Sequence, residues 1–352
     1  MRRMRVAVLA LLGLFAAIPV LGQLRSDLAP PEIDGIWIRP SQEHPAQPVW
    51  GHAEGLRVGL WPLSGPRGLL RVYTPFLGHP PTRMINYIAI EPVLAGQVAR
   101  SFSEMEISQY DDEQGLRFWS ADHPVGFTLA DPTRPAKGVI TRERGMETLT
   151  VYILIEPYRS GASVYVRLRF RSDLPYEVGI ATFTNAGSAE LGACIVTATM
   201  GNYARLRTLH LAGRMAQAGA LWPAFSGDGF AQHRWFSLDE LIRTPDGGAL
   251  FVATPDELDP AAADYEPGTP WHWRYTGEAA TQYWRQEDPH PQLLGLVNGR
   301  TLFWGTQSLI PGGIAFENFE LVEPFREGAE FWFGVIPGIW PVAVEQPIVD
   351  TL

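Results

Sequence analysis

The stretch Gly312–Val335, GGIAFENFELVEPFREGAEFWFGV, contains two short runs of apolar and aromatic residues separated by a turn. The runs are Ile314–Leu321 and Ala329–Val335, and the segment Pro324–Gly328 between them carries the proline and glycine typical of turns. Runs of this length and composition predict a pair of β-strands. Comparable runs recur along the chain, so this stretch indicates how most of the fold is built.

Glu317 is the unusual residue of this stretch. Alternate side chains of a strand point to opposite faces, so Glu317 is expected to share a face with apolar residues, namely Ala315, Phe319 and Leu321. A carboxylate in such surroundings is either paired with a cation or has a raised pKa, and a raised pKa suits a catalytic base near neutral pH. Glu317 is therefore the leading candidate base, with a structural carboxylate paired to an arginine as the alternative.

Short strands separated by turn residues are expected over much of the chain, at a spacing of about ten residues that is typical of a β-sandwich or barrel. Upstream, Gly68–Thr74 and Arg83–Glu91 read as strands. The others are expected at Ser103–Gln109, Arg117–Trp119, Gly126–Leu129, Val139–Arg142, Thr148–Ile155, Ser163–Arg171, Tyr176–Asn185, Ala193–Met200 and Leu293–Leu309, the last turning at Asn298-Gly299. Leu209–Leu221 is the best helix candidate, and Ser237 begins a capping box with Glu240. The prediction is an all-β protein, a large antiparallel β-sandwich with few short helices.

The N-terminus has the pattern of a secretory signal peptide. A basic Met1–Arg5 precedes the apolar Val6–Ile18, and small residues lead to Gln23. We therefore expect residues 1–22 to be a signal peptide and the protein to be exported to a periplasmic or extracellular space, without stable insertion in a membrane. Residues 23–47 are a proline-rich segment, 48–340 a single β-sandwich domain and 341–352 a tail.

Composition excludes several classes of function. The net charge of −10 and the absence of basic blocks argue against nucleic acid as a partner. The single cysteine, Cys194, allows no internal disulfide, and the eight histidines are scattered without metal-ligand spacing. No phosphate-binding or nucleophile motif is present. We expect neither a metal nor a cofactor.

Two stretches resemble the galactose mutarotase-like (aldose epimerase) superfamily. Ile314–Glu317 is similar to the strand that carries that family's catalytic glutamate, and Phe325–Gly328 to the turn before its last strand. Pro175–Gly187 is similar to the segment before the family's active-site strand. The resemblance implies a supersandwich fold and carbohydrate as the ligand. Thr199–Arg205 has no histidine where the epimerases place one, which disfavours epimerase activity; His210 is the nearest replacement.

Arginine rows are the second functional signal. Arg167, Arg169 and Arg171 are expected to share one strand face, and Tyr203, Arg205 and Arg207 another. Such a surface could hold the carboxylate of an acidic sugar, since guanidinium groups bind carboxylates in a bidentate manner. A tyrosine beside it could then carry a proton. The alternative is that these arginines pair with glutamate and aspartate on neighbouring strands.

The remaining candidates are polar or aromatic residues that could contact a sugar. Tryptophan rings stack on the apolar faces of pyranoses, and three of them occur in the long polar segment Asp256–Glu287. The full set of expected substrate-binding residues is Arg83, Asn86, Asn202, Arg205, Arg207, Trp271, Trp273 and Trp284, with Glu317, Tyr203 and His210 as catalytic candidates.

These observations together predict a carbohydrate-active protein. The first hypothesis is a lyase or hydrolase acting on poly- or oligosaccharide in a concave β-sheet cleft, with an acidic sugar as one possible substrate. The second is a sugar-binding or envelope scaffold protein without catalytic activity. An epimerase-like enzyme is the weaker third alternative.

Overall fold

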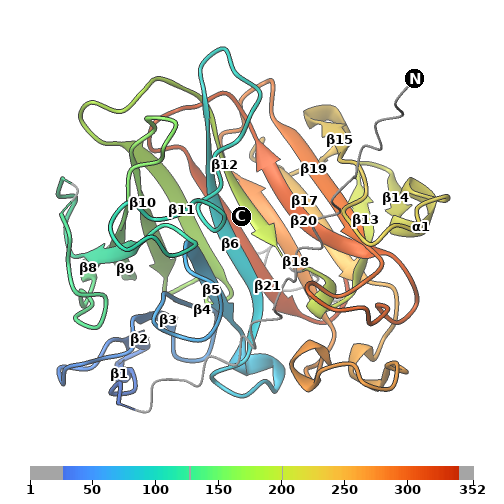
Figure 1. Ribbon diagram of the computed structural model, residues 1–352, viewed down its shortest axis with the longest axis horizontal. Helices are drawn as coiled ribbons and strands as arrows, with labels where there is room; N and C mark the ends of the chain where they lie inside the picture. The colour runs from blue at the N-terminus through green and yellow to red at the C-terminus, as the bar shows by residue number, and fades with distance from the viewer. Residues whose placement is uncertain (1–26, 127, 200, 341–352) are drawn as a thin grey trace, which may run out of the picture.

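The structure is a computed structural model that describes residues 27–126, 128–199 and 201–340. Nearly all regular structure within these residues is β, in two large antiparallel sheets that pack against each other (Figure 1). The predicted all-β sandwich is therefore confirmed. The expected signal peptide and the expected tail lie outside the described residues.

The first sheet has ten strands in the order β1-β2-β3-β4-β5-β6-β12-β20-β19-β15. Their bounds are β1 Glu32–Asp34, β2 Trp37–Arg39, β3 Val49–His52, β4 Arg57–Gly59, β5 Leu69–Tyr73, β6 Met84–Leu94, β12 Leu191–Thr199, β20 Ala315–Val322, β19 Leu294–Arg300 and β15 Arg234–Ser237. β6, β12, β20 and β19 lie side by side in Figure 1.

The second sheet has eleven strands, nine of them in the order β14-β13-β17-β18-β21-β11-β10-β9-β7, with β16 paired to β17 and β8 to β9. Their bounds are β14 Arg214–Gln217, β13 Leu206–Leu211, β17 Ala249–Pro255, β18 Ala280–Gln286, β21 Glu330–Pro337, β11 Glu177–Thr184, β10 Val164–Arg171, β9 Met146–Ile155, β7 Phe118–Ala121, β16 Ile242–Arg243 and β8 Val139–Glu143.

Helical segments of the described residues are a single turn or little more. They are η1 Pro75–Leu77, η2 Gly201–Tyr203, α1 Ala218–Leu221, η3 Leu238–Glu240, η4 Pro260–Ala262 and η5 Trp271–Trp273. The capping box of Ser237 and Glu240 is confirmed at η3. Of the helix expected over Leu209–Leu221, only α1 at Ala218–Leu221 is helical. The rest of the prediction is wrong, because Leu209 and Leu211 alternate into the core from β13 and Gly213, at a φ of 69°, turns the chain into β14.

Four other expectations are wrong. Ser103–Gln109 forms turns, and no strand is assigned to the described residues of Gly126–Leu129. The hairpin turn expected at Asn298-Gly299 is instead the end of β19, where a bulge in the neighbouring strand absorbs the irregularity. Trp284, expected in a long loop, lies within β18.

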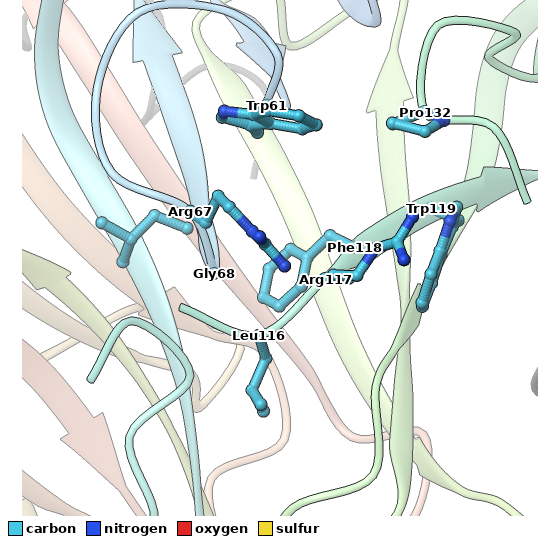
Figure 2. A pocket seen from close by; sticks show the side chains of 9 residues that line it. Trp61, Arg67, Gly68, Leu116, Arg117, Phe118, Trp119 and Pro132 are labelled. Carbon is cyan, nitrogen blue, oxygen red and sulfur yellow. The ribbon is translucent and has the colours of Figure 1, made fainter. Parts of the chain in front are cut away.

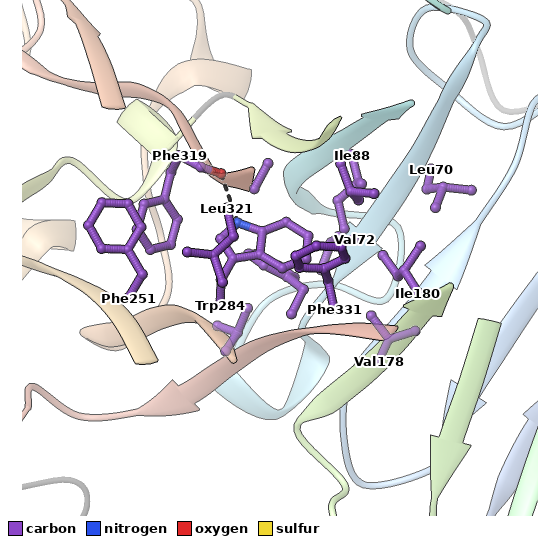
Figure 3. Packing of buried hydrophobic residues seen from close by; sticks show 14 of the residues in the cluster. Leu70, Val72, Ile88, Val178, Ile180, Phe251, Trp284, Phe319, Leu321 and Phe331 are labelled. Carbon is purple, nitrogen blue, oxygen red and sulfur yellow. Dashed lines mark hydrogen bonds between the residues drawn. The ribbon is translucent and has the colours of Figure 1, made fainter. Parts of the chain in front are cut away.

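The main core lies between the two sheets. Phe319 and Leu321 of β20 pack there with Phe251 of β17, Trp284 of β18 and Phe331 of β21 (Figure 3). The indole N–H of Trp284 donates a hydrogen bond of 2.8 Å to the carbonyl oxygen of Phe319, which joins the two sheets directly. This bond satisfies a buried donor that would otherwise cost free energy.

The opposite side of the ten-stranded sheet, which we call the outer face, carries the remaining side chains of the same strands. On β6, Asn86, Ile88 and Ile90 point to the core, whereas Tyr87 and Glu91 point to the outer face. Side chains of β6 therefore alternate between the two faces of the sheet. The loop of residues 95–117, teal in Figure 1, extends past the end of β6 and folds back against this face.

Replacing Trp284 tests the link between the sheets. Trp284→Phe removes the indole N–H and leaves a small void, so the free energy of unfolding should fall by roughly 2–4 kcal/mol. Urea denaturation followed by circular dichroism measures this change. Trp235→Phe, at a side chain that is 60% exposed, should change the stability by less than about 0.5 kcal/mol. Equal effects at the two positions would contradict the packing.

Candidate functional site

A β-bulge in β20 decides which glutamates reach the outer face. Val297 of β19 pairs with Phe319, but Gly299 pairs with Phe316, so Glu317 and Asn318 together oppose the single residue Asn298. Phe316 and Phe319 both point to the core as a result. The expectation that Glu317 shares a face with Phe319 and Leu321 is wrong, because the extra residue breaks the alternation.

Asn298 holds the bulge in place. Its side-chain oxygen accepts a hydrogen bond of 3.0 Å from the backbone N–H of Asn318, a donor that the bulge removes from the ladder. Its side-chain nitrogen lies 3.4 Å from Nε2 of His233. One buried amide therefore connects the distorted strand to a histidine on the neighbouring edge of the sheet.

Glu320 is the centre of a polar cluster on the outer face, which we call the Glu320 cluster and define as Glu91, Arg100, Thr197, His233 and Glu320. Nη2 of Arg100 binds Oε1 of Glu320 at 2.7 Å, and Nη1 binds Glu91 at 2.9 Å and the second oxygen of Glu320 at 3.2 Å. The hydroxyl of Thr197 donates to Glu320. Both carboxylates thus share one guanidinium group.

The two carboxyl groups have different surroundings. Burial raises the pKa of Glu91 to about 8, the nearby charge of Glu320 adds to this, and Arg100 opposes it. Glu320 is fully buried and accepts hydrogen bonds from Arg100 and Thr197. We expect Glu91 to hold a proton at neutral pH, while Arg100 keeps its hydrogen bonds to both carboxyl groups.

His233 is the member of the cluster that reaches solvent. Its Nε2 lies 3.9 Å from Oε1 of Glu320, and 33% of its side chain is exposed. Burial lowers its pKa, while Glu320 opposes that shift. The imidazole is therefore neutral near pH 7 and can accept a proton, and the resulting cation would face a buried carboxylate.

Glu317 lies beside the Glu320 cluster, in a separate buried position. Asn202 of η2 donates a hydrogen bond to its carboxylate, and burial raises the pKa of Glu317 to about 7 while Arg300 opposes the shift. The guanidinium of Arg300 lies 4.8 Å from the ring centre of Phe230 and 5.0 Å from that of Trp304. The direct partner of Glu317 is thus an amide and not a second titratable group.

A stack of aromatic side chains lies next to Glu317. Tyr203 stacks on Trp273 with 4.6 Å between ring centres, and Trp273 stacks on Phe303 at 5.3 Å. The guanidinium of Arg83 lies 5.5 Å from the ring centres of both Tyr203 and Trp271. Burial raises the pKa of Tyr203 above its ordinary value. The structure thus brings together the predicted residues Glu317, Asn202, Tyr203, Arg83, Trp271 and Trp273.

Other predicted residues lie elsewhere. His210 is on the eleven-stranded sheet, where it contacts Thr254 at 3.0 Å, and Asn86 points into the core and binds Gln282 at 2.8 Å. Trp284 is a core residue. None of these three belongs to the Glu320 cluster or contacts Glu317 through an interaction in the described structure.

The arginines of both rows pair with glutamate and aspartate side chains, which is the alternative to sugar binding. Arg205 binds Glu257 at 2.7 Å, and Arg207 binds Asp256 at 2.8 Å and Glu257 at 3.0 Å. On β10, the side chains of Arg167 and Arg169 both pair with Glu330 of β21. β10 carries the first row and β13 carries Arg207, and four strands of the eleven-stranded sheet lie between them. Their charges are therefore largely neutralised within the protein.

The sequence pattern does not indicate Arg100, His233, Asn298, Arg300 or Glu320 as site residues, and Glu91 is predicted only as the last residue of a strand. One signal was available for Glu320: it follows Glu317 by three residues in FENFE, and a bulge puts residues at that spacing on one face. No local pattern indicates Arg100 or His233, which approach from a loop and from an edge strand.

A small hollow near the start of β5 lies apart from these groups. Trp61, Arg67, Arg117 and Trp119 line it (Figure 2), with each guanidinium close to an indole ring. Its volume of about 10 Å³ suits a single water molecule. It is too small to bind a substrate.

The described residues contain no group of three or more histidine, cysteine, aspartate or glutamate side chains placed to hold a metal ion. Among the same residues, no helix is long and apolar enough to cross a bilayer.

Comparison with known proteins adds no relative: no family model, no curated protein and no solved structure matches this chain.

The raised pKa of Glu317 predicts a change in stability with pH. The folded state favours the protonated form, so this contribution is complete below the unfolded pKa of about 4.5 and is lost as the pH rises through about 7. Glu317→Gln stays neutral and can still accept from Asn202. Relative to the wild type, the variant should gain on the order of 2 kcal/mol between pH 5 and pH 8. Denaturation curves at the two pH values measure this, and a constant difference would refute it.

Proposed function

We propose that the outer face of the ten-stranded sheet binds a neutral glycan and that His233, backed by Glu320, acts as the proton carrier in hydrolysis of a glycosidic bond. The observation that carries the proposal is the position of His233: a solvent-reaching imidazole 3.9 Å from a fully buried carboxylate, beside exposed aromatic rings. The resemblance of Ile314–Glu317 to the mutarotase-like superfamily supports a carbohydrate ligand.

The exposed aromatic rings give the sugar its binding surface. Thr197, Glu320, Leu296 and Trp235 are successive partners in one row across β12, β20, β19 and β15. Phe236 packs in the core, so Trp235 points outward, where 60% of its surface is exposed. An indole ring in this position can stack on a pyranose while the hydroxyl groups of the sugar approach His233.

The balance of charge favours a neutral sugar. Arg100 is shared by two carboxylates, Arg205 and Arg207 are paired with Asp256 and Glu257, and Glu317 adds a further acidic group. The support for an acidic sugar came from arginines without partners, and these arginines have partners.

A neutral glycan as the substrate favours hydrolysis over a lyase reaction. A lyase removes a proton made acidic by a neutralised uronate carboxylate, a group that neutral glycans lack. In hydrolysis, the oxygen of water bonds to the anomeric carbon as the glycosidic C–O bond breaks. A neutral imidazole near pH 7 can take the proton that this water loses and pass it to the departing sugar oxygen, so that His233 is neutral again at the end of the reaction. Glu320 would stabilise the imidazolium that forms, and Asn298 would fix the orientation of the ring.

A second candidate function is sugar binding without catalysis. It is favoured by the burial of the carboxylates, since Glu91 is 3% exposed, Glu317 2% and Glu320 0%. None of these groups can touch a bound sugar directly without a change in the surrounding side chains. Under this alternative the cluster serves only to shape the face, and His233 is a hydrogen-bonding residue.

Export of the protein is part of the proposal, and it rests on the signal-peptide pattern of residues 1–22. N-terminal sequencing of the protein recovered outside the cytoplasm of an expressing bacterium would give Gln23 as the first residue.

Binding is tested first, with a panel of neutral and uronic polysaccharides. We expect at least one neutral glycan to bind, and Trp235→Ala to weaken its binding by tenfold or more through loss of the stacked ring. Affinity electrophoresis and isothermal titration measure this. Met215→Ala changes an exposed apolar residue of the eleven-stranded sheet and should leave the affinity unchanged. If only uronic polymers bind, the proposed substrate class is wrong.

Catalysis is tested on the glycan that binds best. His233→Asn should lower the release of new reducing ends by at least a hundredfold, in line with the contribution of a general base, and leave binding within about threefold. His123→Asn, at an exposed histidine remote from the cluster, is the matched control. Binding by the wild type without any new reducing ends would establish the second candidate function instead.

A further inference from the structure

A hollow of about 370 Å³ lies beside the Glu320 cluster, within the loop of residues 95–117. It is formed where the end of β6, the turn around Phe102 and the turn between β9 and β10 meet, and Arg100 is one of its lining residues. Its size is at the lower end of the range of about 300–1,000 Å³ that is usual for small-molecule sites. It is large enough for a ring, unlike the hollow shown in Figure 2.

The lining of this hollow is half apolar and half polar. Leu94, Ala99, Phe102 and Met105 supply apolar surface, and Phe102 and Met105 are 40% and 52% exposed. Gln97, Ser101 and Ser160 supply amide and hydroxyl groups, and the two serine hydroxyls bind each other at 2.8 Å. A hexose ring has the matching character, since it offers apolar C–H faces and a rim of hydroxyl groups.

The charges at the hollow favour a neutral occupant over an anionic one. Both terminal nitrogens of Arg100 are bound by Glu91 and Glu320, so this guanidinium is already engaged by two carboxyl groups. Glu106 also lines the hollow, and its carboxylate accepts a hydrogen bond of 2.9 Å from the backbone N–H of Arg159. An acidic sugar in the hollow would lie close to this carboxylate.

We propose that this hollow is a subsite for one neutral hexose unit of the glycan, separate from the position of the ring on Trp235. This inference rests on the proposed function, because the hollow is a subsite only if the outer face binds a glycan. Arg100 connects the hollow to the Glu320 cluster, which contains His233. Phe102 stacks on the apolar face of the hexose, and Gln97, Ser101 and Ser160 bind its hydroxyl groups.

The test uses Met105 as a reporter at the hollow. The full-length protein is labelled with ¹³C at its methionine methyl groups, and the Met105 signal is assigned by its loss in Met105→Leu. D-glucose, D-galactose and D-mannose are titrated into the millimolar range. We expect a saturable shift of the Met105 signal with at least one of them, and a shift at least tenfold weaker in apparent affinity with D-glucuronate and D-galacturonate.

Paired variants decide whether the response comes from the hollow. Phe102→Ala should abolish the saturable shift, whereas Ile107→Ala, at a residue of similar exposure on the same loop but outside the lining, should retain it. No saturable shift with any neutral hexose, or an unchanged shift in Phe102→Ala, would overturn the subsite.

Trp235→Ala separates this proposal from the proposed function. In that variant the Met105 response should persist while binding of the long glycan weakens. If a glycan binds and is cleaved without any change in the Met105 signal, the subsite proposal is wrong and the proposed function stands. If the Met105 signal responds to hexose but no glycan binds to the outer face, the hexose site is supported and the proposed function is wrong.

Discussion

The hydrogen bond between the Asn298 side chain and the backbone N–H of Asn318 is the constraint on which the candidate site depends. It stabilises a bulge that puts two residues of β20 opposite one residue of β19. In a regular strand, Glu317 and Glu320 would point to opposite faces, and one of them would enter the core beside Trp284. With the bulge, the core receives Phe316 and Phe319, and both glutamates are kept out of it. The packing of the sandwich and the chemistry of the outer face therefore depend on the same irregularity.

The cost of burying charge explains the rest of the arrangement. Three glutamates on one face would destabilise the fold if all were ionised and without partners. Arg100 provides one positive charge for Glu91 and Glu320, and the raised pKa of Glu91 lets that residue avoid ionisation altogether. Glu317 is left with a neutral amide and a more distant arginine, so burial raises its pKa as well. Raised pKa values thus reduce the charge that Glu91 and Glu317 carry in the folded protein, and His233 is the member of the Glu320 cluster that reaches solvent.

Much of the fold could be predicted from the sequence, and the candidate site only in part. Strands such as Ser163–Arg171 were identified because their alternation of apolar and polar residues reflects burial on one side only. Glu317, Tyr203 and Asn202 were selected as candidate site residues, and they lie close together where the chain crosses from β12 to β13. Local pattern could not show the bulge, because it depends on the pairing of β20 with β19. It could not show Arg100 or His233 either, since these reach the sheet from segments more than 80 residues away in the chain from Glu320. His210 and Trp284 were misplaced because neither sheet membership nor strand length is encoded in a short motif.

The most direct test of this account is the rate of amide hydrogen exchange at Asn318, measured by NMR in the wild type and in Asn298→Ala. If the side chain of Asn298 accepts this N–H, the amide should be protected in the wild type. In the variant its exchange should accelerate by at least a hundredfold, while the amides of β12 keep their protection. An Asn318 amide that exchanges at the same rate in both proteins would show that Asn298 does not hold the bulge, and the arrangement of glutamates on the outer face would lose its physical basis.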